Sequence, residues 1–308
     1  MYKDKEYAVY IGDLALDEYY RCSRWPKQSD KENVETLKAV PGGMIANAAC
    51  VRAALDKKTL FWTCMNDGAI SKFLLEDLEN RGIDTSLSVV DNSLPDSKTM
   101  IFLTGDDHSV FIPIIDIDHI DLTDEMMKIL QNASYVYSTI GTLLLLRYKG
   151  KKWNDFAHEI KINGTKVIVD FDVDYERNGD NSRFYNVDIG FFNETGFDSV
   201  RENRSYQQEV DLLHSFGMNM VIVTLAEKGC MIYQKDKEVI KVDARKVDVV
   251  DVTGAGDTFC SSFASMMDEL GIEKAAAFAT AQASICISNM GARSGAVSKQ
   301  EVLNVLNS

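Results

Sequence analysis

The sequence lacks the cysteine and histidine patterns of metal-binding and disulfide-rich proteins. Its six cysteines include no C-x-x-C pair, and its four histidines form no cluster with the spacing of metal ligands. A chain of 308 residues that is 45% hydrophobic can bury a large core, so it does not need such cross-links for stability. We therefore expect reduced cysteines, packed as small apolar residues, in a cytoplasmic protein.

Long apolar runs and positive charge are also scarce. The longest apolar runs, such as 139–146, are too short to cross a bilayer, and the acidic residues of the first segment do not fit a signal peptide. Acidic residues number 47 against 33 basic ones, which gives a net charge of −14. Because such a surface repels phosphate backbones and anionic lipids, we expect neither a nucleic-acid partner nor a membrane partner.

Short β-rich runs alternate with helical patterns along the whole chain. Several of these runs are continuously apolar, as in a parallel sheet that is covered on both faces. The predicted strands are 7–12, 59–64, 135–138, 166–171, 187–193, 220–225 and 246–250. The predicted helices are 45–56, 70–81, 123–130, 153–162, 206–216, 256–270 and 273–289. This alternation, with four prolines and no linker, predicts one α/β domain over 1–308 with a mostly parallel central sheet.

Two segments interrupt the alternation. Residues 14–41 contain no clear helix, and 97–114 contains two β-rich runs around the turn Thr104-Gly-Asp-Asp. We expect both segments to lie outside the main sheet and to form a small β lid. Tyr19, Tyr20 and Trp25 in the first segment could stack on a ligand, form a subunit contact or pack the lid strands together.

A glycine-rich motif late in the chain carries the strongest functional signal. Residues 251–257 read Asp-Val-Thr-Gly-Ala-Gly-Asp and precede a predicted helix. The small residues Gly254, Ala255 and Gly256 allow close approach of a ligand, and N–H groups at a helix start bind anions such as phosphate. Asp257 could then accept a hydroxyl proton during phosphoryl transfer. An ordinary N-capping aspartate explains the same residue equally well.

A second glycine motif opens the predicted helix 45–56. It reads Pro41-Gly-Gly-Met-Ile-Ala-Asn47. Asparagine has low helix propensity, so its place among Ala, Ile and Val indicates that its amide is used. A sugar hydroxyl, which both donates and accepts, would be a natural partner. A simple turn before a helix also accounts for the two glycines.

In this order, the two motifs resemble those of the ribokinase-like (PfkB) family of carbohydrate kinases. Other similar segments are Ile11-Gly-Asp-Leu-Ala-Leu-Asp17, Asn66-Asp-Gly68, Arg81-Gly-Ile-Asp84 and Val223-Thr-Leu-Ala-Glu-Lys-Gly229. The resemblance covers nearly the whole chain. It implies a three-layer α/β fold with a mostly parallel sheet between helices and a small β-strand lid. It also implies an ATP-dependent kinase that transfers the γ-phosphoryl group to a hydroxyl of a small carbohydrate.

The resemblance further implies a role for individual residues. Asp257 matches the general base, and the anion-hole positions are Gly254, Ala255 and Gly256. The positions that match sugar contacts are Asp17, Gly43 and Asn47. The positions that match ATP contacts are Thr224, Ala226, Gly229 and Thr280. Asp251 and Thr253 match a monovalent-cation site, here K⁺, while Mg²⁺ is implied as the counter-ion of ATP. The implied partners are a sugar and ATP. The lid could also form a homodimer, and the sequence leaves the oligomeric state open.

One departure from the family pattern concerns the metal. The family commonly has Asn-x-x-Glu near the phosphates, and here Gly196 stands where the Glu is expected. Asn193 alone would then order the water around Mg²⁺, unless Glu194 or Asp198 replaces the charge of the missing Glu. This departure also leaves open a non-catalytic protein that senses sugars or nucleotides.

Two further departures concern small residues. Ser261 replaces a usual glycine and is small enough to keep helices closely packed. Ala226 also replaces a usual glycine, which a backbone with negative φ would tolerate.

Asp170, Asp172 and Asp174 follow a predicted strand, where α/β proteins place ligands, and are candidate contacts to substrate or metal. The same site residues would serve a nucleoside kinase, and the sequence identifies neither the sugar nor the hydroxyl.

Overall fold

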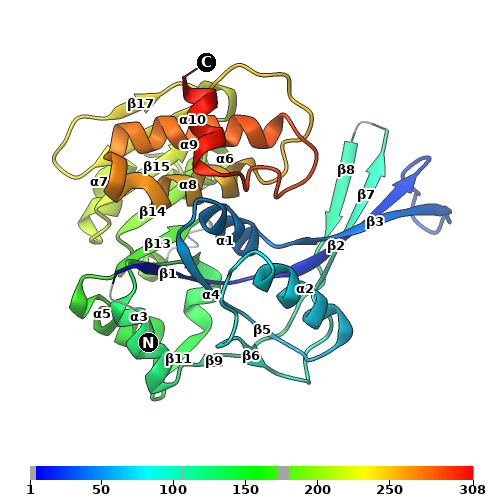
Figure 1. The fold of residues 1–308 in the computed structure, drawn as a ribbon, viewed down its shortest axis with the longest axis horizontal. Helices are drawn as coiled ribbons and strands as arrows, with labels where there is room; N and C mark the ends of the chain where they lie inside the picture. Colours follow the sequence, from blue (N-terminus) through cyan, green and yellow to red (C-terminus); the bar gives the residue numbers. More distant parts are fainter. Residues whose placement is uncertain (1–4, 106, 172–179, 308) are drawn as a thin grey trace.

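A computed structural model describes residues 5–105, 107–171 and 180–307. Within them, the central sheet has eight strands in the order β17-β16-β15-β14-β13-β10-β1-β4 (Figure 1). In chain order these strands are β1 (Tyr7–Ile11), β4 (Lys58–Trp62), β10 (Tyr135–Thr139), β13 (Lys166–Asp170), β14 (Ile189–Asn193), β15 (Met220–Thr224), β16 (Cys230–Gln234) and β17 (Ile240–Val242). Neighbouring strands pair in parallel from β15 through β14, β13, β10 and β1 to β4. Strands β16 and β17 add an antiparallel edge beside β15.

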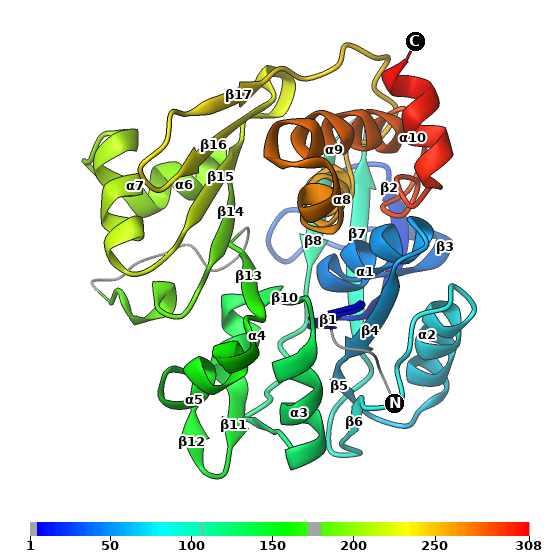
Figure 2. The ribbon, with the colours of Figure 1, turned by 60° about the vertical axis from the view of Figure 1, so that its left-hand side comes forward.

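Helices cover both faces of this sheet (Figure 2). One layer contains α1 (Met44–Ala54), α2 (Ala69–Glu79), α8 (Ala255–Leu270), α9 (Ile272–Ile287) and α10 (Lys299–Leu306). The other contains α3 (Asp124–Asn132), α4 (Ile140–Leu145), α5 (Trp153–Ile160), α6 (Glu194–Arg201) and α7 (Tyr206–Ser215). Strand β1 is apolar throughout because Ala8 and Tyr10 pack into the first layer while Tyr7, Val9 and Ile11 pack into the second. The predicted three-layer α/β fold is confirmed.

A separate four-stranded sheet projects from the body as a lid (Figure 1). Its order is β3-β2-β7-β8, with β2 (Ala15–Cys22), β3 (Val34–Gly42), β7 (Lys98–Thr104) and β8 (Asp107–Phe111). Strand β2 pairs in parallel with β7 and antiparallel with β3. The two irregular segments of the sequence thus supply all four lid strands.

The two faces of the lid differ. Tyr20 lies directly across from Phe102, whereas Phe111 pairs with Met100, so these aromatic rings share one face. Asp17 and Tyr19 alternate with Tyr20 along β2 and therefore point to the other face. We call the face of Asp17 and Tyr19 the inner face, and that of Tyr20 and Phe102 the outer face.

Several smaller elements complete the described chain. Two small sheets pair β5 (Cys64–Met65) with β6 (Val89–Val90), and β11 (Leu146–Tyr148) with β9 (Ile120–Asp121) and β12 (Lys151–Lys152). Three 3-10 helices are η1 (Lys161–Asn163), η2 (Ser182–Phe184) and η3 (Ala226–Lys228). In the described residues, no helix is both long and apolar enough to pass through a bilayer.

One predicted strand is absent. Residues 246–250 form no strand, and Val249 and Val250 are exposed. No strand of the described residues pairs with this segment, and the backbone N–H of Val250 donates instead to the carbonyl of Ile287 at 2.7 Å. A run with β propensity becomes a strand only where a neighbour accepts its hydrogen bonds.

Candidate active site

The two glycine motifs meet where α1 and α8 begin. Asn47, in the first turn of α1, donates from its Nδ2 to Oδ2 of Asp257, in the first turn of α8, at 2.9 Å. The partners are 210 positions apart in the sequence. One turn further into α8, the Ser261 hydroxyl donates to the carbonyl of Ala48 at 2.5 Å. The helix starts that carry the predicted base and the predicted sugar contact are therefore held together.

The start of α8 has a geometry that suits an anion. Gly254 has φ of 78°, and a Cβ on it would come within 2.0 Å of the carbonyl oxygen of Ala292, so only glycine fits. The N–H of Ala255 already donates to Val252 at 3.2 Å. A Cβ on Gly256 would meet no protein atom within 4 Å, so its outer side is open to a ligand. The first-turn N–H groups lie at the positive end of a 16-residue helix.

We call the part of the site that is predicted to bind the sugar the acceptor side. There, Asp17 lies against the second glycine motif. A Cβ on Gly42 would come within 2.0 Å of an Asp17 carboxylate oxygen, and Gly43 has φ of 99° at the start of α1. Burial raises the pKa of Asp17 to about 6, and the nearby charge of Asp13 adds to the rise, while a hydrogen bond from Thr99 and the charge of Arg293 oppose it. The structure thus brings Asp17, Gly43 and Asn47 to one region.

The inner face of the lid also lies near the glycine-rich motif. Burial, followed by the charges of Asp17 and Asp251, raises the pKa of Tyr19 to about 12. Both aspartates therefore lie within the short range over which a charge affects the pKa of Tyr19. The inner lid face is therefore turned toward the predicted site.

Two residues of the site were missed by the sequence analysis. The carboxylate of Asp13 accepts hydrogen bonds from the N–H groups of Met44 and Ile45 at 2.7 and 3.0 Å, which ties the loop after β1 to the start of α1. Arg293 donates from Nε to Oδ1 of Asn47 at 3.0 Å. Asp13 stands inside a motif that carries the family resemblance, so it could have been found. Arg293 stands in a loop with no apolar pattern or motif.

The predicted nucleotide contacts come from two regions. Thr224 ends β15, Ala226 and Gly229 belong to the following turn, and Thr280 is buried on α9. A Cβ on Gly229 would come within 1.9 Å of the carbonyl oxygen of Val242. Ala226 has φ of 49°, so the expectation of a negative φ is wrong there. A left-handed alanine costs about 1–2 kcal/mol, which the hydrogen bond from Leu225 N–H to Gly229 O at 2.7 Å helps to offset.

The residues predicted to organise Mg²⁺ have other partners. Oδ1 of Asn193 accepts the N–H of Gly196 at 2.7 Å and so caps α6. Glu194 pairs with Lys228 at 3.1 Å, and Asp198 pairs with Arg201 at 2.5 Å. The described residues contain no group of three or more His, Cys, Asp or Glu side chains that could hold a metal ion. A divalent ion here would depend on phosphate and water oxygens for most of its ligands.

Asp251 and Thr253 form a compact oxygen-rich turn. Oδ1 of Asp251 accepts from both the N–H and the hydroxyl of Thr253, at 2.9 and 2.7 Å, and Oδ2 accepts from Gly291 N–H at 2.9 Å. Burial alone would raise the pKa of Asp251, but these hydrogen bonds outweigh it and lower the pKa. The carboxylate therefore stays ionised, and its hard oxygen atoms suit a monovalent cation.

Of the three aspartates near the end of β13, only Asp170 belongs to the described residues. Its Oδ2 accepts a hydrogen bond from the hydroxyl of Tyr137 at 3.0 Å, and its side chain is buried. Asp172 and Asp174 lie outside the described residues. Asp170 is thus a polar core residue that anchors a tyrosine.

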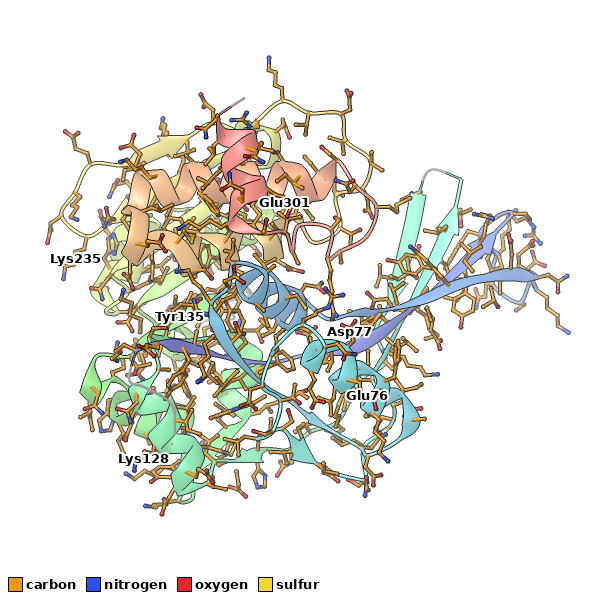
Figure 3. The ribbon with its side chains drawn as sticks, viewed as in Figure 1. Glu76, Asp77, Lys128, Tyr135, Lys235 and Glu301 are labelled. Atoms are coloured by element: carbon orange, nitrogen blue, oxygen red, sulfur yellow. The ribbon has the colours of Figure 1, made fainter. Side chains whose placement is uncertain are left out.

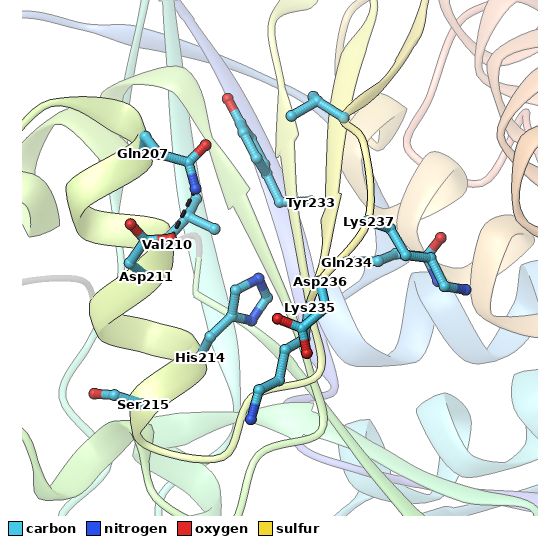
Figure 4. A pocket seen from close by; sticks show the side chains of 11 residues that line it. Gln207, Val210, Asp211, His214, Ser215, Tyr233, Gln234, Lys235, Asp236 and Lys237 are labelled. Carbon is cyan, nitrogen blue, oxygen red and sulfur yellow. Dashed lines mark hydrogen bonds between the residues drawn. The ribbon is translucent and has the colours of Figure 1, made fainter.

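One pocket lies away from these residues. It encloses about 450 Å³ between α7 and the turn from β16 to β17 (Figure 4). His214, Asp211 and Lys235 line it, at the amino end of β15, whereas the predicted site lies at the carboxyl end of the parallel strands. A second, mostly apolar pocket of about 180 Å³ borders Gly12, Asp13 and Leu14. The site is therefore defined by its side-chain contacts and not by the 450 Å³ pocket.

Comparison with known proteins shows the family and the fold of the chain. The profile of the pfkB family carbohydrate kinases matches residues 5–299. A ribokinase of Arabidopsis thaliana is 28% identical over 97% of this chain and 80% of its own. The structure of Arabidopsis thaliana ribokinase complexed with ribose and ATP superposes with a TM-score of 0.84 at 25% identity, over 99% of this chain and 100% of that one. A nucleoside kinase of Methanocaldococcus jannaschii has the same fold, with a TM-score of 0.83 at 19% identity over 99% of both chains.

Proposed function

Because the chain belongs to the pfkB family of carbohydrate kinases, we propose that it is an ATP-dependent sugar kinase. It transfers the γ-phosphoryl group of ATP to a hydroxyl of a small carbohydrate, and residues 1–308 act as one kinase domain. The observation that carries this proposal is the 2.9 Å hydrogen bond between Asn47 and Asp257. It places an amide that suits a sugar hydroxyl beside a carboxylate at a helix start that suits a phosphate.

In the proposed reaction, Asp257 accepts the proton of the acceptor hydroxyl while the oxygen of that hydroxyl attacks the γ-phosphorus of ATP. The bond between that phosphorus and the β–γ bridging oxygen breaks, and ADP leaves. The N–H groups in the first turn of α8 stabilise the charge on the transferred phosphoryl group. The small residues Gly254 and Ala255 give that group close access to the backbone at Gly256. Asp17, Gly43 and Asn47 hold the sugar hydroxyls.

On the nucleotide side, we assign ATP contacts to Thr224, Ala226, Gly229 and Thr280. Mg²⁺, when bound, neutralises phosphate charge, and it fits here because its ligands in such sites are mainly phosphate and water oxygens. Asn193 would contact that water shell through its side chain. The oxygen atoms of Asp251 and Thr253 would hold K⁺ beside the first turn of α8.

A nucleoside kinase is the second candidate, since a nucleoside kinase shares this fold with a TM-score of 0.83. A non-catalytic sensor fits less well, because a sensor would not need a carboxylate positioned by Asn47 at an anion-binding helix start. The discriminating experiment measures ADP release from ATP and Mg²⁺ across a panel of free sugars, sugar phosphates and nucleosides. Turnover of sugars supports the proposal, turnover of nucleosides alone favours the second candidate, and no turnover favours the sensor.

We also propose that the enzyme is a homodimer through the outer lid face. Four aromatic rings gather there, and they are Tyr20, Trp25, Phe102 and Phe111. Trp25 is 47% exposed and Phe111 is 44% exposed. Exposed aromatic clusters of this kind mark protein contacts, and this cluster lies opposite Asp17, away from the acceptor. The six cysteines, all within the described residues, form no disulfide, which supports a cytoplasmic enzyme.

A further inference from the structure

Arg293 connects three separate parts of the candidate site. It follows α9 in the chain, and its side chain is only 9% exposed. Its guanidinium donates from Nε to Asn47 Oδ1 at 3.0 Å and from Nη2 to the carbonyl of Gly42 at 3.1 Å, and Nη1 pairs with Asp77 of α2. Figure 3 shows Asp77 near the base of the lid strands. One side chain therefore contacts α1, α2 and the end of lid strand β3.

The contact with Asn47 fixes which way its amide points. A guanidinium has only donors, and an ionised carboxylate has only acceptors. The amide oxygen must therefore face Arg293, and the NH₂ group must face Asp257, as the 2.9 Å bond records. If the Asn47 amide were reversed, its NH₂ group would face the N–H of Arg293, and its oxygen would face the carboxylate oxygen of Asp257. Arg293 thus determines that Asn47 donates to the carboxylate.

The contact with Gly42 acts on the acceptor side. Gly42 ends β3 and lies directly against the Asp17 carboxylate. By holding its carbonyl, Arg293 fixes the turn on which both Asp17 and Gly43 depend. The ion pair with Asp77 holds the guanidinium itself, because a planar guanidinium with its nitrogens bonded on three sides has one orientation.

We propose that Arg293 is a positioning residue for phosphoryl transfer. It orients Asn47 toward Asp257 and holds the Gly42 turn, so that the acceptor hydroxyl and the carboxylate meet in a productive geometry. This inference rests on the proposed kinase function. It predicts an effect on the chemical step that is transmitted through Asn47, and little effect on ATP binding.

A double-mutant cycle between Arg293 and Asn47 tests this. After wild-type turnover on one acceptor is established, kcat and KM for ATP are measured for Arg293→Gln, Asn47→Ala and the double variant. We expect Arg293→Gln to lower kcat about ten- to a hundredfold, as for loss of a charged hydrogen bond, with KM for ATP unchanged. In the Asn47→Ala background the same change should lose most of its effect, since coupled residues are not additive.

Arg81 provides a matched control. It pairs with the same Oδ2 atom of Asp77, at 3.2 Å, but it is 40% exposed, and among the described residues the bonds to Asn47 and Gly42 come from Arg293. Arg81→Gln should leave kcat unchanged. If Arg293→Gln does not fold, the cycle is run with Arg293→Lys, which keeps the charge but loses the planar fork.

The possible results separate the two proposals. Additive effects in the cycle, or an unchanged kcat in Arg293→Gln or Arg293→Lys, would overturn the positioning role while leaving the kinase proposal intact. A wild-type enzyme with no turnover on any sugar or nucleoside would instead overturn the proposed function, and the positioning role with it.

Discussion

Asp257 is the residue whose replacement tests the chemistry most directly. Asparagine has nearly the same shape, and its amide oxygen can still accept the hydrogen bond from Asn47, so Asp257→Asn should fold with an unchanged Tm. Because an amide cannot take the hydroxyl proton, kcat should fall by about 10²–10⁴-fold. Steady-state kinetics on an acceptor used by the wild type, with thermal unfolding as the control, would check this. A kcat near that of the wild type would rule out Asp257 as the base.

Asp17 should make sugar use depend on pH. Burial raises its pKa to about 6, so the carboxylate is ionised above that pH and protonated below it. The ionised form accepts hydrogen bonds from sugar hydroxyls better than the protonated form does. The KM for the acceptor should therefore rise as pH falls through about 6, while the KM for ATP stays level. Kinetics between pH 5 and 8, roughly the range that brackets this pKa, would measure both.

Stability should show the opposite trend at the same residue. The folded pKa of Asp17 lies above its unfolded value of 3.8, so its protonated form favours the folded state. This contribution is fully present below the unfolded pKa and is lost as pH rises through about 6. Asp17→Asn has no titrating group and should flatten both dependences. If the variant kept the wild-type rise in acceptor KM at low pH, another group would be responsible.

At the scale of elements, the packing of α1 against α8 depends on a buried polar network. Ser261 donates to Ala48 and lies 2.8 Å from the hydroxyl of Tyr10, which in turn is 3.0 Å from that of Tyr135. Arg52 of α1 donates to Tyr135 at 3.0 Å. Sequence analysis explained Ser261 by its small size alone. The structure adds that its hydroxyl links α8 to both α1 and β1.

We therefore expect Ser261→Ala to destabilise the fold. It leaves the buried Tyr10 hydroxyl and the Ala48 carbonyl each without one partner, at a cost of about 1–3 kcal/mol. Ser262 is the matched control, because it is also fully buried in α8 but its hydroxyl has no hydrogen-bond partner among the described residues. Ser262→Ala should be neutral or slightly stabilising. Urea unfolding of both variants would decide, and equal losses would show that the network adds no stability.

The elements that sequence analysis predicted correctly are those with a strong local pattern. Strand β1 is apolar at every position, and α8 and α9 are long and rich in Ala and Ser. The strand expected at 246–250 is absent, because no strand of the described residues pairs with this segment. Local pattern reports what a segment prefers, whereas pairing depends on neighbours that are distant in the chain.

The same reasoning explains what was missed at the site. Asn47 and Asp257 could be singled out because each stands in a glycine motif with a recognisable geometry. Arg293 could not, because its role depends on contacts with residues that are distant in the chain, such as Asn47, 246 positions away. Ala226 was predicted to have a negative φ, but its φ is 49°, in a turn closed by the hydrogen bond from Leu225 N–H to Gly229 O. Residues whose role depends on tertiary contact leave no local signal.

At the scale of the whole molecule, the lid has two surfaces with different tasks. The inner face carries Asp17 and Tyr19 and is turned toward the site, while the outer face carries stacked rings at centroid distances of 5.2 Å for Tyr20 with Phe102 and 5.9 Å for Trp25 with Phe111. The rings pack on one another but leave Trp25 and Phe111 nearly half exposed. A second copy that covered the same patch would satisfy the closed symmetry of a dimer.

This arrangement predicts a dimer that depends on the outer face. Size-exclusion chromatography with light scattering should give the wild type twice the 34.5 kDa mass of one chain. The double variant Trp25→Ser/Phe111→Ser lacks both exposed rings and so loses most of the apolar area of the outer lid face. This variant should therefore elute as a monomer. Ile162→Ser is the control, since Ile162 is 70% exposed but lies in η1, outside the lid. A monomeric wild type, or a variant that stays dimeric, would show that the aromatic cluster serves only to pack the lid strands together.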